Sequence, residues 1–382
     1  MDIIRKETEK ADCVQAYQMC HSLAGGTGSG LGTLILNRIR DTYFDRLTAA
    51  FSVYPSPTLS DVVVEPYNTV LSVNDMIECA DQSFTLDNEA LVRILAEKKV
   101  STEAAKGFGQ YNELISYVMS GITSSLRFPG QLNGDLRKMS VNLVPFPRLH
   151  FFVVSQSPLL TADSSSNYTK ITTQELTSSV LDAKSYYVNI DPEDGKFLTA
   201  SVLYRGAKED ISTFEVDKEI AGVPFQAKFY GQFAEWIPNN FKYSLINIAS
   251  KGWDSNTSAI VNIPMSATFV ANHTAIKNSF QIFMNKFKAL YSKKAFLHWY
   301  YEEGMDEDNF VEAQKNINDL ICEYQEKTDV VVGMDNLDGG YEPPDDDEDY
   351  NEDDILAKYT GGGGGDDDEE ELDDDLDFLA SD

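Results

Sequence analysis

The sequence contains few residues of the kinds that bind metals or form disulfides. Its four cysteines (Cys13, Cys20, Cys79 and Cys322) include no C-x-x-C pair, and its four histidines show neither an H-E-x-x-H motif nor zinc-finger spacing. Zinc sites and disulfide-stapled domains depend on spacings of that kind. We therefore expect reduced thiols, no metalloenzyme chemistry and no metal site.

Long hydrophobic runs and an excess of basic residues are also missing. No apolar segment approaches the ~20 residues that a membrane-spanning helix needs, and residues 1–10 are too charged for a signal peptide. The chain has 62 acidic and 31 basic residues, a formal net charge of −31. Because a nucleic-acid-binding surface must be basic, we expect neither a membrane nor a nucleic acid as a partner.

The negative charge is concentrated at the C-terminus. Between residues 335 and 382 there are twenty-two acidic residues and one basic residue, Lys358. A segment made largely of Asp, Glu and Gly cannot bury enough apolar surface to offset the entropy cost of ordering. The composition predicts a disordered acidic tail over residues 331–382, which would attract basic proteins.

The most specific motif is the glycine-rich stretch Ala-Gly-Gly-Thr-Gly-Ser-Gly at residues 24–30. An apolar, strand-like run precedes it, and apolar residues at helical spacing follow it (Leu31, Leu34, Ile35, Ile39 and Tyr43). A glycine loop that leads into a helix presents unpaired backbone N–H groups to an anion. The motif therefore predicts a phosphate site, with a flexible turn capped by Thr27 or Ser29 as the alternative. It matches neither G-x-x-x-x-G-K-[ST] nor G-x-G-x-x-G.

A second expected strand, residues 49–54, completes a crossover unit whose ligand would lie at the carboxyl ends of the strands. Two carboxylates, Asp61 and Glu65, follow at the same end. They could accept hydrogen bonds from a ribose, or they could stabilise the start of a helix over residues 68–81. The residues alone leave these alternatives open.

The rest of the chain reads as a mixed α/β protein. A long helix over residues 110–126 carries an apolar face suited to a buried central position. Later strands are expected at residues 150–154, 198–204, 242–248 and 266–271, with a long polar connection over 251–263, and two long helices at 275–301 and 308–325 close the fold.

Taken together, these motifs resemble the tubulin family, and within it a divergent β-type chain. Besides the glycine loop, five blocks carry the resemblance: V-V-V-E-P-Y-N at 62–68, R-F-P-G-Q-L-N at 127–133, V-P-F-P-R-L-H-F-F at 144–152, E-W-I-P-N-N at 235–240 and K-A-F-L-H-W-Y at 294–300. The resemblance runs from Met1 to about residue 325. Roughly the first quarter of the family sequence has no counterpart.

The resemblance implies a tubulin-like α/β fold in five parts. These are a partial, Rossmann-like GTP-binding (GTPase) domain at 1–104, a central core helix at 105–126, a mixed α/β intermediate domain at 127–272, C-terminal helices forming a hairpin at 273–330, and the disordered acidic tail at 331–382.

It also implies a binding site for GTP or GDP. The phosphates would be held by Ser22, two residues before the glycine loop, and by residues of the loop itself (Gly25, Gly26, Thr27, Gly28 and Ser29). Asp61 and Glu65 would lie near the ribose, which favours the functional reading of these carboxylates. Asn88 and Asn112 would read the guanine edge, because an amide supplies both a donor and an acceptor. Phe108 would stack on the base.

Lys138 stands where the family's α-type subunit offers a glutamate to its neighbour's γ-phosphate and where the β-type has lysine. A lysine cannot serve as that acid/base group, so we expect no catalytic residue in this chain and an interface role for Lys138. The implied partners are an α-tubulin heterodimer partner, other tubulin subunits in the microtubule, and basic microtubule-associated or motor proteins that bind the tail. The implied location is the microtubule cytoskeleton of the cytoplasm, with axonemal microtubules as an alternative.

The family residues without a counterpart include the first phosphate loop and the acidic residue associated with Mg²⁺. We therefore expect Mg²⁺ as a cofactor whose family ligand is missing here, and whether this chain turns GTP over stays open. A truncated chain is the favoured explanation. The alternative is a tubulin paralogue without nucleotide turnover that acts as a specialised lattice component or regulator.

Overall fold

The computed structural model describes residues 1–56, 62–97, 108–131, 135–158, 172–207, 211–223, 229, 231–254 and 259–330. Within these residues, eight strands form one sheet in the order β1-β2-β3-β5-β10-β6-β7-β4. Their bounds are β1 (Ala16–Ser22), β2 (Leu47–Tyr54), β3 (Gln82–Asp87), β4 (Gly130–Gln131), β5 (Phe151–Ser157), β6 (Phe197–Gly206), β7 (Phe241–Ile246) and β10 (Met265–His273).

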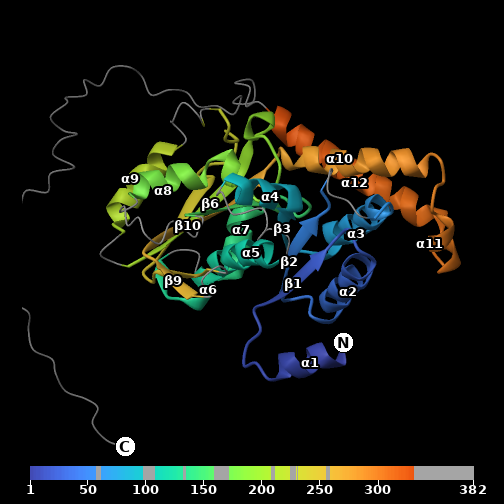
Figure 1. Ribbon diagram of the computed structural model, residues 1–382, viewed down its shortest axis with the longest axis horizontal. Helices are drawn as coiled ribbons and strands as arrows, with labels where there is room; N and C mark the ends of the chain where they lie inside the picture. The colour runs from blue at the N-terminus through green and yellow to red at the C-terminus, as the bar shows by residue number, and fades with distance from the viewer. Residues whose placement is uncertain are drawn as a thin grey trace, which may run out of the picture. The chain divides into compact units, whose positions relative to one another are not determined.

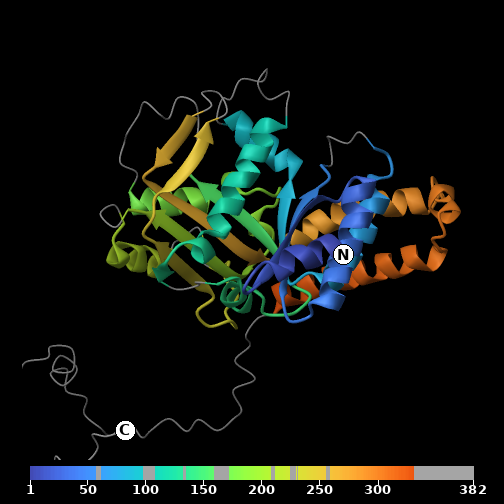
Figure 2. The same cartoon turned by 90° about the horizontal axis from the view of Figure 1, so that it is seen from below.

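The sheet is parallel at one end and mixed at the other. Strands β1, β2, β3 and β5 run parallel to one another, whereas β10 is antiparallel to both β5 and β6. Figures 1 and 2 show the blue strands of the parallel part continuing into the green and orange strands of the mixed part. The α/β fold class expected from the sequence is confirmed.

Helices cover both faces of the sheet. One buried hydrophobic cluster joins one face to α2 (Gly32–Thr42), α3 (Glu65–Cys79), α8 (Thr173–Val180), α9 (Thr213–Gly222), α10 (Ile276–Tyr291) and α12 (Glu307–Asp329). A second cluster joins the other face to α4 (Asn88–Glu97), α5 (Gly109–Ile122) and α7 (Leu136–Leu143). Alternation along the strands separates the two clusters: Phe151 belongs to the first and Phe152 to the second.

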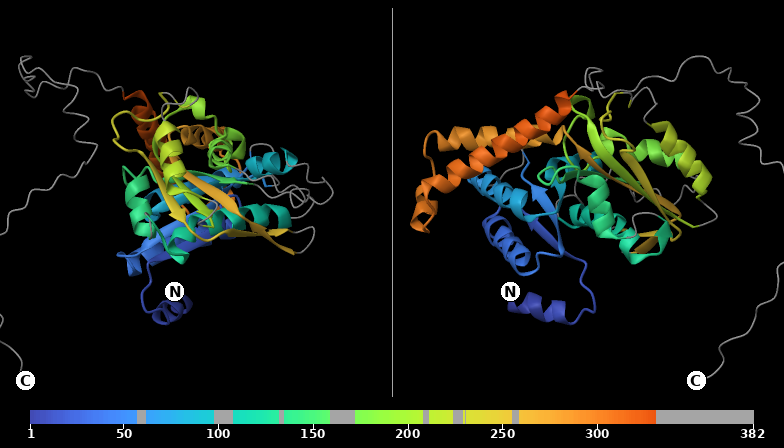
Figure 3. Two further views of the ribbon diagram at one scale, coloured as in Figure 1. Left: turned by 90° about the vertical axis from the view of Figure 1, so that its left-hand side faces the viewer. Right: turned by 180° about the vertical axis from the view of Figure 1, so that it is seen from behind.

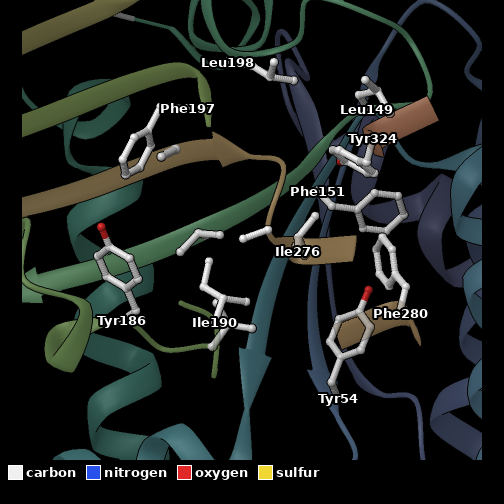
Figure 4. Close-up of a cluster of buried hydrophobic side chains, with 14 of the residues drawn as sticks. Tyr54, Leu149, Phe151, Tyr186, Ile190, Phe197, Leu198, Ile276, Phe280 and Tyr324 are labelled. Carbon is white, nitrogen blue, oxygen red and sulfur yellow. The ribbon is translucent and has the colours of Figure 1, made fainter. Parts of the chain in front are cut away.

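Aromatic packing fixes the closing pair of helices to the sheet. The ring of Phe280 on α10 lies 5.1 Å from that of Phe151 on β5 and 6.3 Å from that of Tyr324 on α12. Tyr54, at the end of β2, contacts the same phenylalanine (Figure 4). Helices α10 and α12 run side by side over this core (Figure 3, right).

Three segments differ from the expectation. Residues 82–87 form β3, which the sequence did not reveal. The connection over 251–263 is largely two paired strands, β8 (Ser250–Asp254) and β9 (Ala259–Ile263). The helix expected over 275–301 ends at Tyr291, and a separate short helix, α11 (His298–Glu302), follows.

The chain also begins with α1 (Asp2–Glu9), which buries no side chain, and α5 is followed by the single-turn α6 (Ser124–Arg127). None of the helices in the described ranges combines the length and the apolar character needed to span a membrane. The predicted acidic tail lies outside the described residues.

Candidate functional site

The parallel strands bring several predicted site residues to one edge of the sheet. Ser22 of β1 pairs with Val53 of β2, and Val53 pairs with Leu86 of β3. Since all three strands run in the same direction, the glycine loop after β1 and Asn88 after β3 leave the sheet at the same edge. Two strand spacings separate them, about 10 Å.

The glycine loop is packed on one side and open on the other. Residues 27–31 form a wide helical turn that continues into α2. A Cβ atom on Gly28 would lie 2.5 Å from the carbonyl oxygen of Ser22, so a larger residue cannot fit there without moving the backbone. A Cβ atom on Gly25 or Gly26 would meet nothing within 4 Å. The loop therefore presses against the end of β1 with Gly28 and leaves Gly25 and Gly26 accessible.

Two polar side chains hold the loop in this shape. His21 contacts the carbonyl oxygen of Gly28 through Nδ1 and the hydroxyl of Ser52 through Nε2, both at 2.8 Å. Because a carbonyl can only accept, Nδ1 carries the proton and Nε2 accepts from Ser52. Burial lowers the pKa of His21, which favours this neutral form.

Asn68 is the second anchor. Its amide nitrogen donates to the carbonyl oxygen of Ala24 at 3.0 Å, and its own oxygen accepts from the Tyr300 hydroxyl at 2.8 Å. Asn68 lies on α3 and Tyr300 on α11. The loop is thus tied to the closing helices as well as to the sheet.

This arrangement leaves the loop suited to an anion. The carbonyl oxygens of Ala24, Gly25 and Gly28 already accept hydrogen bonds from Asn68, Ser29 and His21. The first N–H groups of a helix have no acceptor within that helix, and those of the turn that opens at Thr27 carry the positive end of its dipole. Donors rather than acceptors are therefore available beside the accessible glycines.

The other predicted contacts lie on neighbouring helices. Asn88 is the exposed first residue of α4. Asn112 is exposed on α5, which contacts α4, and with Gln18 of β1 it lines a groove of about 380 Å³. Phe108, just before α5, is 79% exposed, so its ring is available for stacking. Both predicted amides therefore lie on adjacent helices, which cover the face of the sheet opposite to α2 and α3.

The two carboxylates are placed differently. Glu65 is the half-buried first residue of α3, and the N-cap of that helix is Val64. Asp61 lies outside the described residues. The capping alternative holds for one of the two carboxylates. Glu65 lies in the first turn of α3, as that alternative predicts, whereas Asp61 is not the N-cap, because the helix begins at Glu65 after Val64.

Lys138 lies away from the glycine loop. It is exposed on α7, where its backbone N–H donates to the capping carboxylate of Asp135 at 2.7 Å. The start of α7 lies beside the opposite ends of the parallel strands: Arg137 donates to the carbonyl oxygen of Asp45, just before β2, and Gln82, the first residue of β3, donates to that of Leu136. On the same helix, Val141 is 73% exposed. In the described parts of the chain, no group of three or more His, Cys, Asp or Glu residues could hold a metal ion.

Sequence reasoning missed the residues that shape the site. It singled out neither His21 nor Asn68, although Asn68 is the last residue of the block at 62–68 that carries the family resemblance. It also assigned a role to Asn88 but none to its neighbour Asp87. No spacing signal would reveal His21, because its partners Gly28 and Ser52 are brought to it by the fold of the loop and by β2.

A glycine loop at the carboxyl edge of a parallel sheet, followed by amide-bearing helices, defines a nucleotide-binding class of protein. The family comparison agrees: residues 1–96 match the GTPase domain of the Tubulin/FtsZ family, and residues 147–285 match the tubulin C-terminal domain. The chain belongs to the tubulin family.

Three similar curated proteins are β-tubulins. The chain is 50% identical to a tubulin beta chain of Cicer arietinum over 332 residues. This aligned region covers 87% of the present chain and 70% of the Cicer protein. It is 50% identical over 329 residues to a tubulin beta-4 chain of Zea mays (86% and 70%) and 48% identical over 350 residues to a tubulin beta-6 chain of Gossypium hirsutum (90% and 74%). The resemblance found in the sequence is confirmed, and the glycine loop, Glu65 and Asn88 all fall inside the matched GTPase domain.

Proposed function

We propose that this chain is a GTP-binding, β-type structural subunit of microtubules that pairs with an α-type subunit. Its membership of the tubulin family and its similarity to β-tubulins support this function. The observation that carries the proposal is the glycine loop, whose carbonyl oxygens are occupied while the donors at its open side are not.

In this proposal the phosphates of GTP lie against the backbone N–H groups of Gly25, Gly26, Thr27 and Gly28, with the Ser22 hydroxyl beside them. Ser29, which is buried, supports the loop from behind, because its hydroxyl donates to the carbonyl oxygens of Gly25 and Gly26. Asn88 and Asn112 read the guanine edge, and Phe108 stacks on the base. Glu65 and Asp61 face the ribose. The accessible side of the loop and the exposure of Asn88, Asn112 and Phe108 support these roles.

Bound Mg²⁺ would neutralise charge on the phosphates. The described residues contain no cluster of three or more metal-binding side chains that could hold this ion.

Head-to-tail assembly would use the exposed face of α7. This face carries Lys138 and Arg137 beside the exposed Val141, a combination of charge and apolar surface suited to a protein interface. Lys138 would place a fixed positive charge near the nucleotide of the α-type partner. Because an ammonium group has no lone pair with which to accept a proton, Lys138 could not activate water at the partner's nucleotide. Hydrolysis of this chain's own GTP would instead use an acidic residue from the next α-type subunit.

The test of nucleotide binding is a competition experiment on the full chain with a fluorescent GTP analogue. We expect unlabelled GTP to displace the analogue well before ATP, and Asn112→Asp to weaken GTP binding about tenfold or more, because a carboxylate cannot donate to the base. The matched control is Asn309→Asp on the exposed start of α12. Equal displacement by GTP and ATP would contradict the proposal.

The test of assembly adds purified α-tubulin and follows sedimentation of polymer and release of phosphate. Co-sedimentation with phosphate release supports the full proposal. GTP binding and co-sedimentation without phosphate release would instead support the lattice component without turnover.

A further inference from the structure

The helix that carries Asn88 is held by a distant part of the chain. Arg93 of α4 donates to Oδ1 of Asn189 at 2.9 Å, and its other terminal nitrogen donates to the carbonyl oxygens of Tyr186 and Ala183 at 3.1 and 3.4 Å. Helix α4 falls largely within the matched GTPase domain, whereas residues 183–189 belong to the matched C-terminal domain. Arg93 therefore ties one family domain to the other.

Asp87 ties the start of the same helix to the same segment. Its backbone N–H donates to the carbonyl oxygen of Tyr187 at 2.8 Å, and its carboxylate accepts the N–H of Glu89 at 3.0 Å. Asp87 is only 7% exposed, while Asn88 is exposed. The residues on either side of Asn88 are thus fixed, and the amide between them points to solvent from a rigid turn.

We propose that Asp87 and Arg93 are positioning residues for base recognition: they hold the first turn of α4 against residues 183–189, so that selectivity for guanine depends on contacts with the C-terminal domain and on the charge of Asp87. This inference rests on the proposed role of Asn88 in reading guanine.

The charge of Asp87 changes within an accessible pH range. Burial raises the pKa of Asp87 to about 6, and the nearby Glu89 carboxylate acts in the same direction. The hydrogen bonds from the backbone of Glu89 and Asn189, and the positive charge of Arg93, oppose this shift without cancelling it. Below about pH 6 the neutral carboxyl is a weaker acceptor for the Glu89 N–H. The first turn of α4 then loosens and recognition of the base weakens.

The test compares the affinities of the full chain for GTP and ATP, because their ratio reports base recognition and cancels the ionisation of the phosphates. Arg93→Met keeps the aliphatic stem and removes three hydrogen bonds, and we expect it to lower the GTP/ATP affinity ratio about tenfold. Arg148→Met is the matched control, since Arg148 makes similar bonds to Glu323 and Asn316 on α12. Its ratio should equal that of the wild type.

A pH series supplies the second readout. We expect the wild-type ratio to fall between pH 7.5 and pH 5, whereas Asp87→Asn should give a low ratio that does not change with pH. An unchanged ratio in Arg93→Met, or a pH-independent ratio in the wild type, overturns the positioning role. If Arg93→Met does not fold, Arg93→Lys and the pH series decide the question.

The outcomes separate this inference from the proposed function. A wild type that does not prefer GTP at any pH contradicts the proposed function itself. A wild type that prefers GTP, with variants that keep this preference, contradicts the positioning role alone.

Discussion

At the scale of single residues, the glycine loop depends on one position more than on the others. Gly28 lies against the backbone of Ser22, where an added Cβ would approach the carbonyl oxygen to 2.5 Å and the nitrogen to 3.0 Å. Strand backbone cannot move aside, so we expect Gly28→Ala to lower the free energy of unfolding by about 2–3 kcal/mol and to weaken GTP binding. Urea unfolding and nucleotide titration measure the two effects.

Gly30 supplies the control within the same loop. An added Cβ there meets nothing within 4 Å, so Gly30→Ala should leave stability unchanged or raise it by up to about 1 kcal/mol, because it restricts the unfolded chain. Equal losses in the two variants would mean that the contact with Ser22 does not limit the loop.

The ionisation of Asp87 should also make the free energy of unfolding depend on pH. Its folded pKa, about 6, lies above the value of 3.8 for an unperturbed carboxyl. The folded state therefore favours the protonated form, and the resulting stability is fully present below about pH 4 and is lost as the pH rises through 6. We expect Asp87→Asn to be more stable than the wild type at pH 8 by about 3 kcal/mol, with the difference vanishing near pH 4. Thermal unfolding across this range checks it, and a constant difference would contradict it.

At the scale of elements, α5 depends on a close approach to the sheet. A Cβ on Gly121 would lie 2.0 Å from Oγ1 of Thr268 and 2.8 Å from Oε1 of Gln156, two buried side chains joined by a hydrogen bond. In an exposed helix, Gly→Ala gains about 1 kcal/mol. Here we expect Gly121→Ala to cost about 1–3 kcal/mol, measured by urea unfolding.

Two variants test the cause. Gly109→Ala, at the open start of the same helix, should cost nothing, because an added Cβ there meets no atom within 4 Å. In the double variant Gly121→Ala/Thr268→Ala, the loss in free energy of unfolding should be smaller than the sum of the losses in the two single variants, because removal of the threonine side chain frees the space. Strict additivity would refute a steric conflict.

Some helices and strands could be predicted from the sequence, and others could not. The glycine loop, α2, α5 and most strands were predictable, because their period or composition is strong. Strand β3 was not, because both of its faces are buried and its polar residues are satisfied by distant partners: Thr85 donates to the carbonyl oxygen of Phe152 and Gln82 to that of Leu136. No polar/apolar alternation marks such a strand.

The break between α10 and α11 could not be predicted from the sequence either, because a tertiary contact causes it. Lys294 and Phe296 adopt positive φ angles of 51° and 62°, although neither residue favours them. The Tyr67 hydroxyl donates to the carbonyl oxygen of Ala295 between them at 2.9 Å, so a tertiary contact overrides local helix propensity. The roles of the site residues and the domain boundaries remain predictions of the sequence.

At the scale of the whole molecule, the charge distribution predicts salt-dependent binding. The net charge of −31 lies mostly in residues 335–382, and electrostatic attraction is screened over about 10 Å at 0.1 M salt but about 3 Å at 1 M. We expect a lysine-rich peptide to bind the full chain at low salt and to dissociate as salt rises. A chain ending at residue 330 should not bind it, with calorimetry as the measurement. Binding that survives this deletion would place the acceptor on the folded body instead.

The two matched domains share one sheet, in which they meet where β3 pairs with β5. Only two residue pairs join β3 to β5, Ser83 with Phe151 and Phe84 with Phe152, and the rings of Phe51, Phe84 and Phe152 lie in contact across β2, β3 and β5. A rotation of one half against the other would have to break this ladder and unstack the rings. A twist of the first three strands would therefore be passed to the rest of the sheet through these paired strands and contacting rings.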